Sequence, residues 1–126
     1  MTARLEHANF SVSNPAETAA WMEALFGWHI RWQGDALSDG RTIHVGSKDA
    51  YLAVYAPKGG TNGTSTRYEH AGSLNHIAVV ADDLDATEAK VKAHGFLTHS
   101  HQDYEPGRRF YLQDADLIEY KVVQYD

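Results

Sequence analysis

Two stretches of sequence decide the fold: LEHANFSV at residues 5–12 and LNHIAVV at residues 74–80. Each is a short, mostly apolar run with a histidine at its third position, His7 in the first and His76 in the second. The histidines lie about 70 residues apart, and a segment repeated at such an interval predicts two similar halves that pack together. Two histidines at matched positions of such halves are the strongest functional lead in the sequence.

Each stretch is followed by a helix with its own start and stop signals. The apolar spacing predicts helices over residues 16–26 and 84–94. A capping residue precedes each helix and a glycine ends it: Asn14 and Gly27 for the first, Asp82 or Asp83 and Gly95 for the second. The two halves therefore repeat a helix as well as a strand.

Three further strands are expected after each helix. The apolar runs that predict them cover residues 28–33, 41–46 and 51–55 in the first half, and 96–101, 107–112 and 117–124 in the second. A turn at Ser38-Asp39-Gly40 leads into the second of these six runs. We predict an α+β protein with one domain made of two strand–helix–three-strand modules, at about 1–57 and 73–126. A glycine-rich linker over about 58–72 joins them.

Composition narrows the function classes. The chain has 126 residues, of which 43% are hydrophobic and 22% charged, as in an ordinary soluble domain. A formal net charge of −6 argues against nucleic acid as a partner. The absence of cysteine excludes disulfides, thiolate metal sites and cysteine nucleophiles. No apolar run is long enough to span a bilayer and no export signal is evident, so we expect a cytoplasmic protein without a membrane partner.

The chain resembles the vicinal oxygen chelate superfamily of glyoxalase I, bleomycin-resistance proteins and extradiol dioxygenases. The resemblance rests on LEH at residues 5–7, ALFGW at 24–28, LNHIAV at 74–79, and RFYLQDAD at 109–116 running into Ile118-Glu119-Tyr120. It covers essentially the whole chain. It implies two modules that form an open, cup-shaped mixed sheet around a divalent metal. The turn before Glu119 is two residues shorter than in the family, which preserves the phase of the strand.

The resemblance also implies a set of metal ligands. His7 and His76 take the first-strand positions, and Glu119 takes the last-strand position of the second module. The matching position of the first module is expected at or beside Ala53, which cannot bind a metal. Two histidines and one carboxylate form the ligand set of non-haem Fe(II) oxygenases, and the same set also suits Mn, Ni, Co or Zn. For each histidine alone, the alternative is a half-buried strand residue. For Glu119, it is an exposed residue at a sheet edge.

Other residues are candidates for catalysis or substrate binding. His44 and Tyr111 occupy equivalent strands, and a histidine beside an open metal position can act as a general acid or base. His101, and with it His99, is an alternative on another strand. Arg109, with Arg108, is a candidate clamp for an anionic substrate, and Tyr55 is a candidate substrate contact. The alternative roles are packing for the tyrosines and a solvated hairpin end for the arginines.

The leading function is a metal-dependent enzyme for a small molecule whose adjacent oxygens chelate the metal. The reaction is open between a ring-cleaving dioxygenase and a lyase or isomerase. The alternative is a metal-free, bleomycin-resistance-like protein that binds its ligand in an aromatic groove. A homodimer is expected in either case, because it would cover sheet edges and because short members of the family often assemble their sites from two chains.

Overall fold

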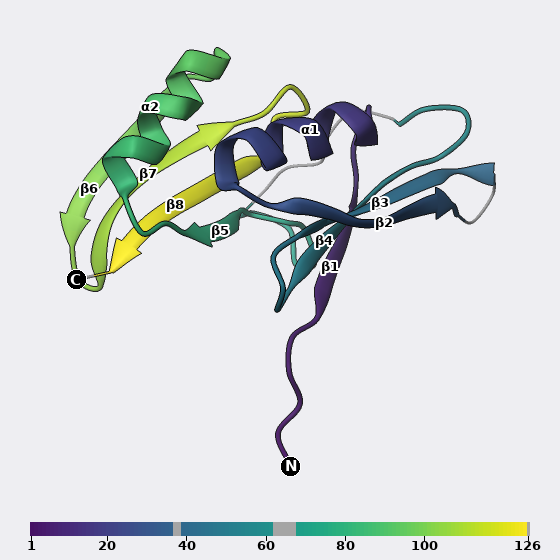
Figure 1. Ribbon diagram of the computed structural model, residues 1–126, viewed down its shortest axis with the longest axis horizontal. Helices are drawn as coiled ribbons and strands as arrows, with labels where there is room; N and C mark the ends of the chain where they lie inside the picture. Colours follow the sequence, from purple (N-terminus) through teal and green to yellow (C-terminus); the bar gives the residue numbers. More distant parts are fainter. Residues whose placement is uncertain (37–38, 62–67, 126) are drawn as a thin grey trace. The chain divides into compact units, whose positions relative to one another are not determined.

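The computed structural model describes residues 1–36, 39–61 and 68–125 (Figure 1). The chain divides into two compact units, Met1–Asn62 and Gly63–Asp126, which we call unit 1 and unit 2. Each unit is a strand–helix–three-strand module, which confirms the predicted α+β class with two repeated modules. Ser38 of the predicted turn and the middle of the predicted linker lie outside the described residues.

Unit 1 is a four-stranded mixed sheet with one helix. In chain order its elements are β1 (His7–Ser11), α1 (Pro15–Phe26), β2 (His29–Asp35), β3 (Arg41–Gly46) and β4 (Tyr51–Ala56). The strands lie in the order β1-β4-β3-β2. The first strand runs parallel to β4 and pairs His7 with Tyr51, whereas the other pairs are antiparallel.

Unit 2 repeats this arrangement. Its elements are β5 (Ile77–Val80), α2 (Leu84–His94), β6 (Thr98–Tyr104), β7 (Gly107–Gln113) and β8 (Glu119–Tyr125). The strands lie in the order β5-β8-β7-β6, and β5 is parallel to β8. The first strand of each module therefore pairs with the last strand of the same module.

The helix ends follow the predicted signals. The side chain of Asn14 accepts a hydrogen bond from the backbone N–H of Glu17 at 3.2 Å, and Asp83 accepts one from Ala86 at 3.0 Å. The side-chain caps satisfy N–H groups that the first helical turn leaves without a partner. Gly27 and Gly95 end the helices with φ of 70° and 107°, a left-handed conformation that glycine adopts without steric cost.

Each helix covers one face of its own sheet (Figure 1). The buried apolar residues of unit 1 are Val12, Ala19, Trp21, Met22, Leu25, Ile43, Val45, Leu52, Ala53 and Val54. Those of unit 2 are Val79, Leu84, Val91, Phe110, Leu112, Ile118, Tyr120, Val122 and Val123. Since side chains alternate across a strand, the residues between the helix-facing ones project from the opposite face. The candidate site residues of β3, β4, β7 and β8 lie on that opposite face.

Candidate metal and substrate site

Four rings cluster on the face of the unit 1 sheet that α1 leaves uncovered. Tyr51 lies at the centre, with its ring 4.8 Å from His7 and 4.5 Å from His44, and the planes lie within 14° and 23° of parallel. Trp32 lies 5.1 Å from His44 on the other side, and half of its surface is exposed. Two histidines that sequence analysis named, one as a metal ligand and one as a catalytic group, therefore share one aromatic surface.

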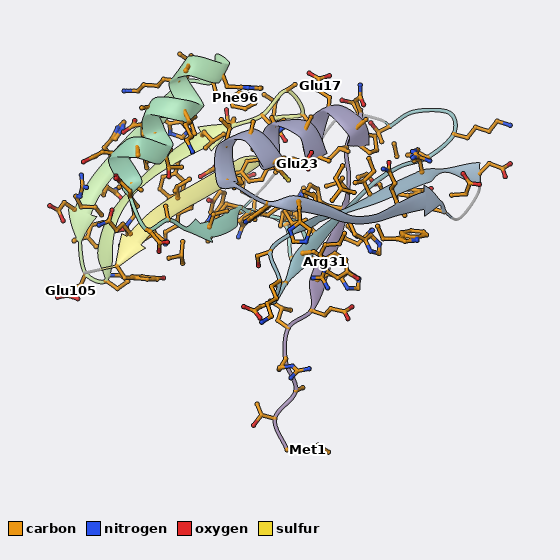
Figure 2. All side chains as sticks on the ribbon, viewed as in Figure 1. Met1, Glu17, Glu23, Arg31, Phe96 and Glu105 are labelled. Atoms are coloured by element: carbon orange, nitrogen blue, oxygen red, sulfur yellow. The ribbon has the colours of Figure 1, made fainter. Side chains whose placement is uncertain are left out.

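Charged groups surround the Tyr51 ring. Glu6 Oε1 lies 2.9 Å from His7 Nδ1 and accepts a hydrogen bond from the Tyr51 hydroxyl at 3.3 Å. The guanidinium of Arg31 lies 4.6 Å from the Tyr51 ring centroid, a cation–π geometry, and donates to the carbonyl of Ser47. Figure 2 shows Arg31 on the side of the sheet away from α1. Sequence analysis missed Glu6, which directly precedes β1, and Arg31, which lies within β2.

These contacts shift three pKa values in unit 1. The hydrogen bonds from His7 and Tyr51 lower the pKa of Glu6 and keep its carboxylate ionised. Burial lowers the pKa of His44, and electrostatic interactions with His7 and Arg31 lower it further. Burial, together with the charge of Glu6, raises the pKa of Tyr51. At neutral pH the surface therefore presents a neutral imidazole and a protonated phenol beside an ionised carboxylate.

A recess of about 720 Å³ lies beside this cluster. It is lined by residues 1–6, Arg31, Lys48 and Asp49, so Glu6 and Arg31 belong to both features. Cationic side chains slightly outnumber carboxylates in this lining, since Arg4 joins Arg31 and Lys48. An anionic group of a small molecule would find partners here.

In unit 2, a tyrosine from the segment before β5 brings His76 and Glu119 together. The hydroxyl of Tyr68 lies 3.1 Å from His76 Nδ1 and donates to Glu119 Oε1 at 3.4 Å. The His76 ring meets the edge of Tyr111 at 5.8 Å, and His99 stacks on Tyr111 at 6.1 Å. Two predicted ligands thus share one hydrogen-bonding partner, and the predicted Tyr111 borders them. Tyr68 has no counterpart in the repeat and could not be identified from the sequence.

The turn that leads into Glu119 is held by Asp114. Its Oδ1 accepts hydrogen bonds from the backbone N–H groups of Asp116 and Ile118, both at 2.9 Å, and its Oδ2 accepts one from Tyr120 at 3.1 Å. Burial raises the pKa of Asp114. The buried carboxylate thereby fixes the start of β8, where Glu119 projects.

The strand registers correct one expectation for unit 1. In unit 2, β5 pairs Ile77 with Tyr120, so His76 falls beside Glu119. In unit 1, β1 pairs His7 with Tyr51. The counterpart of Glu119 is therefore Tyr51 rather than Ala53, which is buried two residues further along β4. Unit 1 therefore has the Tyr51 phenol, whose pKa is raised, at the position where unit 2 has the Glu119 carboxylate.

His101 lies apart from Tyr111. A bulge in β6 between His99 and Gln102, with Ser100 at φ 56°, turns His101 toward α2. There its Nε2 lies 2.6 Å from Glu88 Oε2, which also accepts a hydrogen bond from Thr98. The structure therefore places His101 in a contact between β6 and α2.

The two predicted substrate contacts also lie away from the ring clusters. Arg109 is 5% exposed, donates to the carbonyls of Gly107 and Tyr104, and stacks on the Tyr104 ring at 4.3 Å. These contacts commit its guanidinium to the turn between β6 and β7. Tyr55 packs closely over Gly40, near the opposite end of β4 from Tyr51.

The predicted ligands are of residue types that suit a divalent metal. Among the described residues, no three His, Asp or Glu side chains form a cluster that could hold a metal ion. His7 lies in unit 1, whereas His76 and Glu119 lie in unit 2. Imidazole nitrogen and carboxylate oxygen suit first-row divalent metals, and each histidine has a hydrogen-bonding partner on its second nitrogen, as metal-binding histidines usually do.

Comparisons with known proteins assign the family. The Glyoxalase/Bleomycin resistance protein/Dioxygenase superfamily matches residues 4–119, and the chain belongs to this superfamily. No curated protein sequence matches the chain. Among the described residues, no helix is long and apolar enough to cross a membrane.

Solved structures share the fold over nearly the full length. A glyoxylase/bleomycin resistance protein/dioxygenase domain from Frankia sp. EAN1pec has a TM-score of 0.84 at 15% identity and covers 100% of both chains. The fosfomycin resistance protein FosX from Listeria monocytogenes has 0.78 at 17%, covering 100% of this chain and 96% of its own. The antibiotic-binding protein TnmS3 from Streptomyces sp. CB03234 has 0.76 at 17%, covering 99% and 98%. At these identities the likeness establishes the fold alone.

Proposed function

We propose that this protein is a metal-dependent enzyme that acts on a small molecule with adjacent oxygen atoms. His7, His76 and Glu119 would hold one divalent metal: Fe(II), Mn, Ni, Co or Zn. The observation that carries the proposal is that His7 and His76 occupy equivalent positions at the first strand of each module. Glu119 lies beside His76, and the Tyr68 hydroxyl contacts both side chains. Membership of the superfamily supports it.

The metal would act as a Lewis acid on the chelated oxygens, or with Fe(II) it would activate O₂ for ring cleavage of a catechol. The residues of the chain would bind the substrate and move its protons. The aromatic surface of Tyr51 and Trp32 would pack against a planar substrate, while Arg31 and the adjoining recess would take an anionic group. His44, which shares that surface with His7, would exchange a proton with the substrate.

Metal content is the first test. The protein purified without oxygen should hold about one metal per chain by elemental analysis, or reach that level when Fe(II), Mn or Zn is added. A His76→Ala variant should lose the metal. His29→Ala is the matched control, because this exposed histidine lies outside the site. If the wild-type chain remains metal-free after all three additions, the metalloenzyme proposal is wrong.

The aromatic surface of unit 1 favours one alternative function, a metal-free protein that binds a ligand. The stacked rings of His7, Tyr51 and His44, with Trp32 beside them, offer flat apolar area without any metal. The TnmS3 protein, which has the same fold, is an antibiotic-binding protein. Under this alternative His76→Ala keeps the affinity for the ligand, and Trp32→Ala weakens it.

We also propose that the chain forms a homodimer. Within their own sheets β1, β2, β5 and β6 are edge strands, and such strands have backbone groups available for pairing. Sedimentation equilibrium should return twice the chain mass of 14.0 kDa. A monomer at micromolar concentration would contradict this assembly.

A further inference from the structure

Both histidines proposed as ligands have a hydrogen-bonding partner on the same ring nitrogen. The partner of His7 Nδ1 is Glu6 Oε1 at 2.9 Å, and the partner of His76 Nδ1 is the Tyr68 hydroxyl at 3.1 Å. A neutral imidazole carries its proton on one nitrogen, and only the other nitrogen has a lone pair for a metal. The chemistry of each partner therefore decides which nitrogen can coordinate.

For His7, the partner can only accept. The Glu6 side chain is exposed, and an exposed carboxylate at neutral pH accepts hydrogen bonds but has no proton to donate. The contact at 2.9 Å therefore requires the proton on His7 Nδ1 and leaves the lone pair on Nε2. The same Glu6 oxygen accepts from the Tyr51 hydroxyl at 3.3 Å, which ties the carboxylate to β4.

For His76, the tautomer follows from the single proton of the Tyr68 hydroxyl. The Tyr68 hydroxyl donates its one proton to Glu119 Oε1 at 3.4 Å. The contact between Tyr68 and His76 Nδ1 then needs a proton from the ring. A chain of hydrogen bonds thus runs from His76 through Tyr68 to Glu119, and it also leaves the lone pair on Nε2. The backbone N–H of Tyr68 donates to the Asn75 side chain at 2.6 Å, which anchors the tyrosine.

We propose that Glu6 and Tyr68 are positioning residues that hold His7 and His76 in the Nδ1–H tautomer, so that Nε2 coordinates in both modules. The proposal rests on the proposed metal site. Partners of this kind orient metal-binding histidines and are worth about 10- to 100-fold in metal affinity. His101 provides an internal contrast, because its Nε2 faces the Glu88 carboxylate at 2.6 Å and therefore carries a proton.

The tautomers can be measured without any metal. We would label the histidine rings with ¹⁵N and record long-range ¹H–¹⁵N spectra of the metal-free protein at about pH 8, where histidines are mostly neutral. His7 and His76 should show the Nδ1–H pattern and His101 the Nε2–H pattern. Glu6→Ala should alter His7 alone, and Tyr68→Phe should alter His76 alone. Glu23→Ala on α1 and Tyr125→Phe on β8 are the matched controls.

An Nε2–H pattern for His7 or His76 in the wild type would overturn the proposal. Tautomers that stay unchanged in both variants would overturn it as well, because Glu6 and Tyr68 would then not be their cause. These results are independent of the proposed function, which fails separately if the wild-type chain binds no metal.

Metal affinity supplies the second readout. Competition with a chelator for Mn(II) or Co(II) should show affinity reduced about 10- to 100-fold in Glu6→Ala and in Tyr68→Phe. Glu6→Gln should retain more affinity than Glu6→Ala, because its amide oxygen can still accept the Nδ1 proton. Wild-type affinity in both Glu6→Ala and Tyr68→Phe would refute the positioning role.

Discussion

Replacement of Asp114 tests how the strand that carries Glu119 is held. Asp114 is 6% exposed and accepts three hydrogen bonds, of which those from Ile118 and Tyr120 come from buried residues. Alanine would leave the buried Ile118 N–H without its acceptor, at a cost of roughly 1–3 kcal/mol, and would remove the Tyr120 hydrogen bond, which is worth roughly 0.5–1.5 kcal/mol. We therefore expect Asp114→Ala to lower the free energy of unfolding by about 1.5–4.5 kcal/mol, against a typical total of about 5–15 kcal/mol.

Asparagine at this position should behave differently. In Asp114→Asn the amide oxygen can still accept from both backbone N–H groups, and the amide nitrogen can donate to the Tyr120 hydroxyl. We expect the free energy of unfolding of Asp114→Asn to lie within about 1 kcal/mol of the wild-type value, because the asparagine side chain keeps its hydrogen-bonding partners. Because burial raises the pKa of Asp114, the native state binds this proton more tightly than the unfolded state does. The contribution of Asp114 to stability should therefore decrease as pH rises from 3.8 through the raised pKa, and this decrease should be absent from Asp114→Asn.

Urea unfolding provides the assay. Far-UV circular dichroism follows both units, whereas tryptophan fluorescence follows unit 1, because Trp21, Trp28 and Trp32 all lie there. A loss below about 1 kcal/mol in Asp114→Ala would refute the reasoning, since it lies under the cost of even one buried unpaired donor. Equal losses in the alanine and asparagine variants would also refute it, because the hydrogen bonds would then not be the cause.

Three further substitutions test local features. Burial by itself raises the pKa of Glu88, but the hydrogen bonds from Thr98 and His101 outweigh this effect, so the pKa is lowered from 4.5. The stability that the ionised Glu88 contributes is therefore present above pH 4.5 and is lost as pH falls through the lowered pKa. Glu88→Gln should therefore lose less melting temperature on acidification than the wild type; an equal loss would contradict this. Leu117 has φ 63°, a left-handed conformation that strains a residue with a side chain but not glycine, and it is 55% exposed. Leu117→Gly should therefore raise the free energy of unfolding by up to about 1 kcal/mol in calorimetry. A decrease would show that the strain at Leu117 is negligible. Asn14→Ala should lower the stability of unit 1 by about 1 kcal/mol in urea unfolding followed by tryptophan fluorescence, and an unchanged midpoint would mean that the cap is not needed.

The class of fold could be predicted from the sequence because the signals that start and end its helices are local. The caps at Asn14 and Asp83 and the glycines at 27 and 95 act on the residues beside them, so their effect needs no knowledge of the rest of the chain. The repeat of an apolar strand with a histidine then indicated two modules, and the structure and the superfamily match confirm the class of fold. The assignment of His7, His76 and Glu119 as ligands stays a prediction.

The surroundings of those residues depended on strand register and on contacts between distant segments. Tyr51 lies beside His7 because β4 pairs with β1 in one register, and a one-residue shift would turn every side chain of the strand to the other face. His101 points toward α2 because of a bulge, which no periodic pattern contains. Tyr68 reaches His76 and Glu119 from outside the repeat. The sequence by itself determined the modules and their two histidines, since these follow from short-range preferences. Only the tertiary structure decided which side chains surround each histidine, because pairing between remote strands fixes those neighbours.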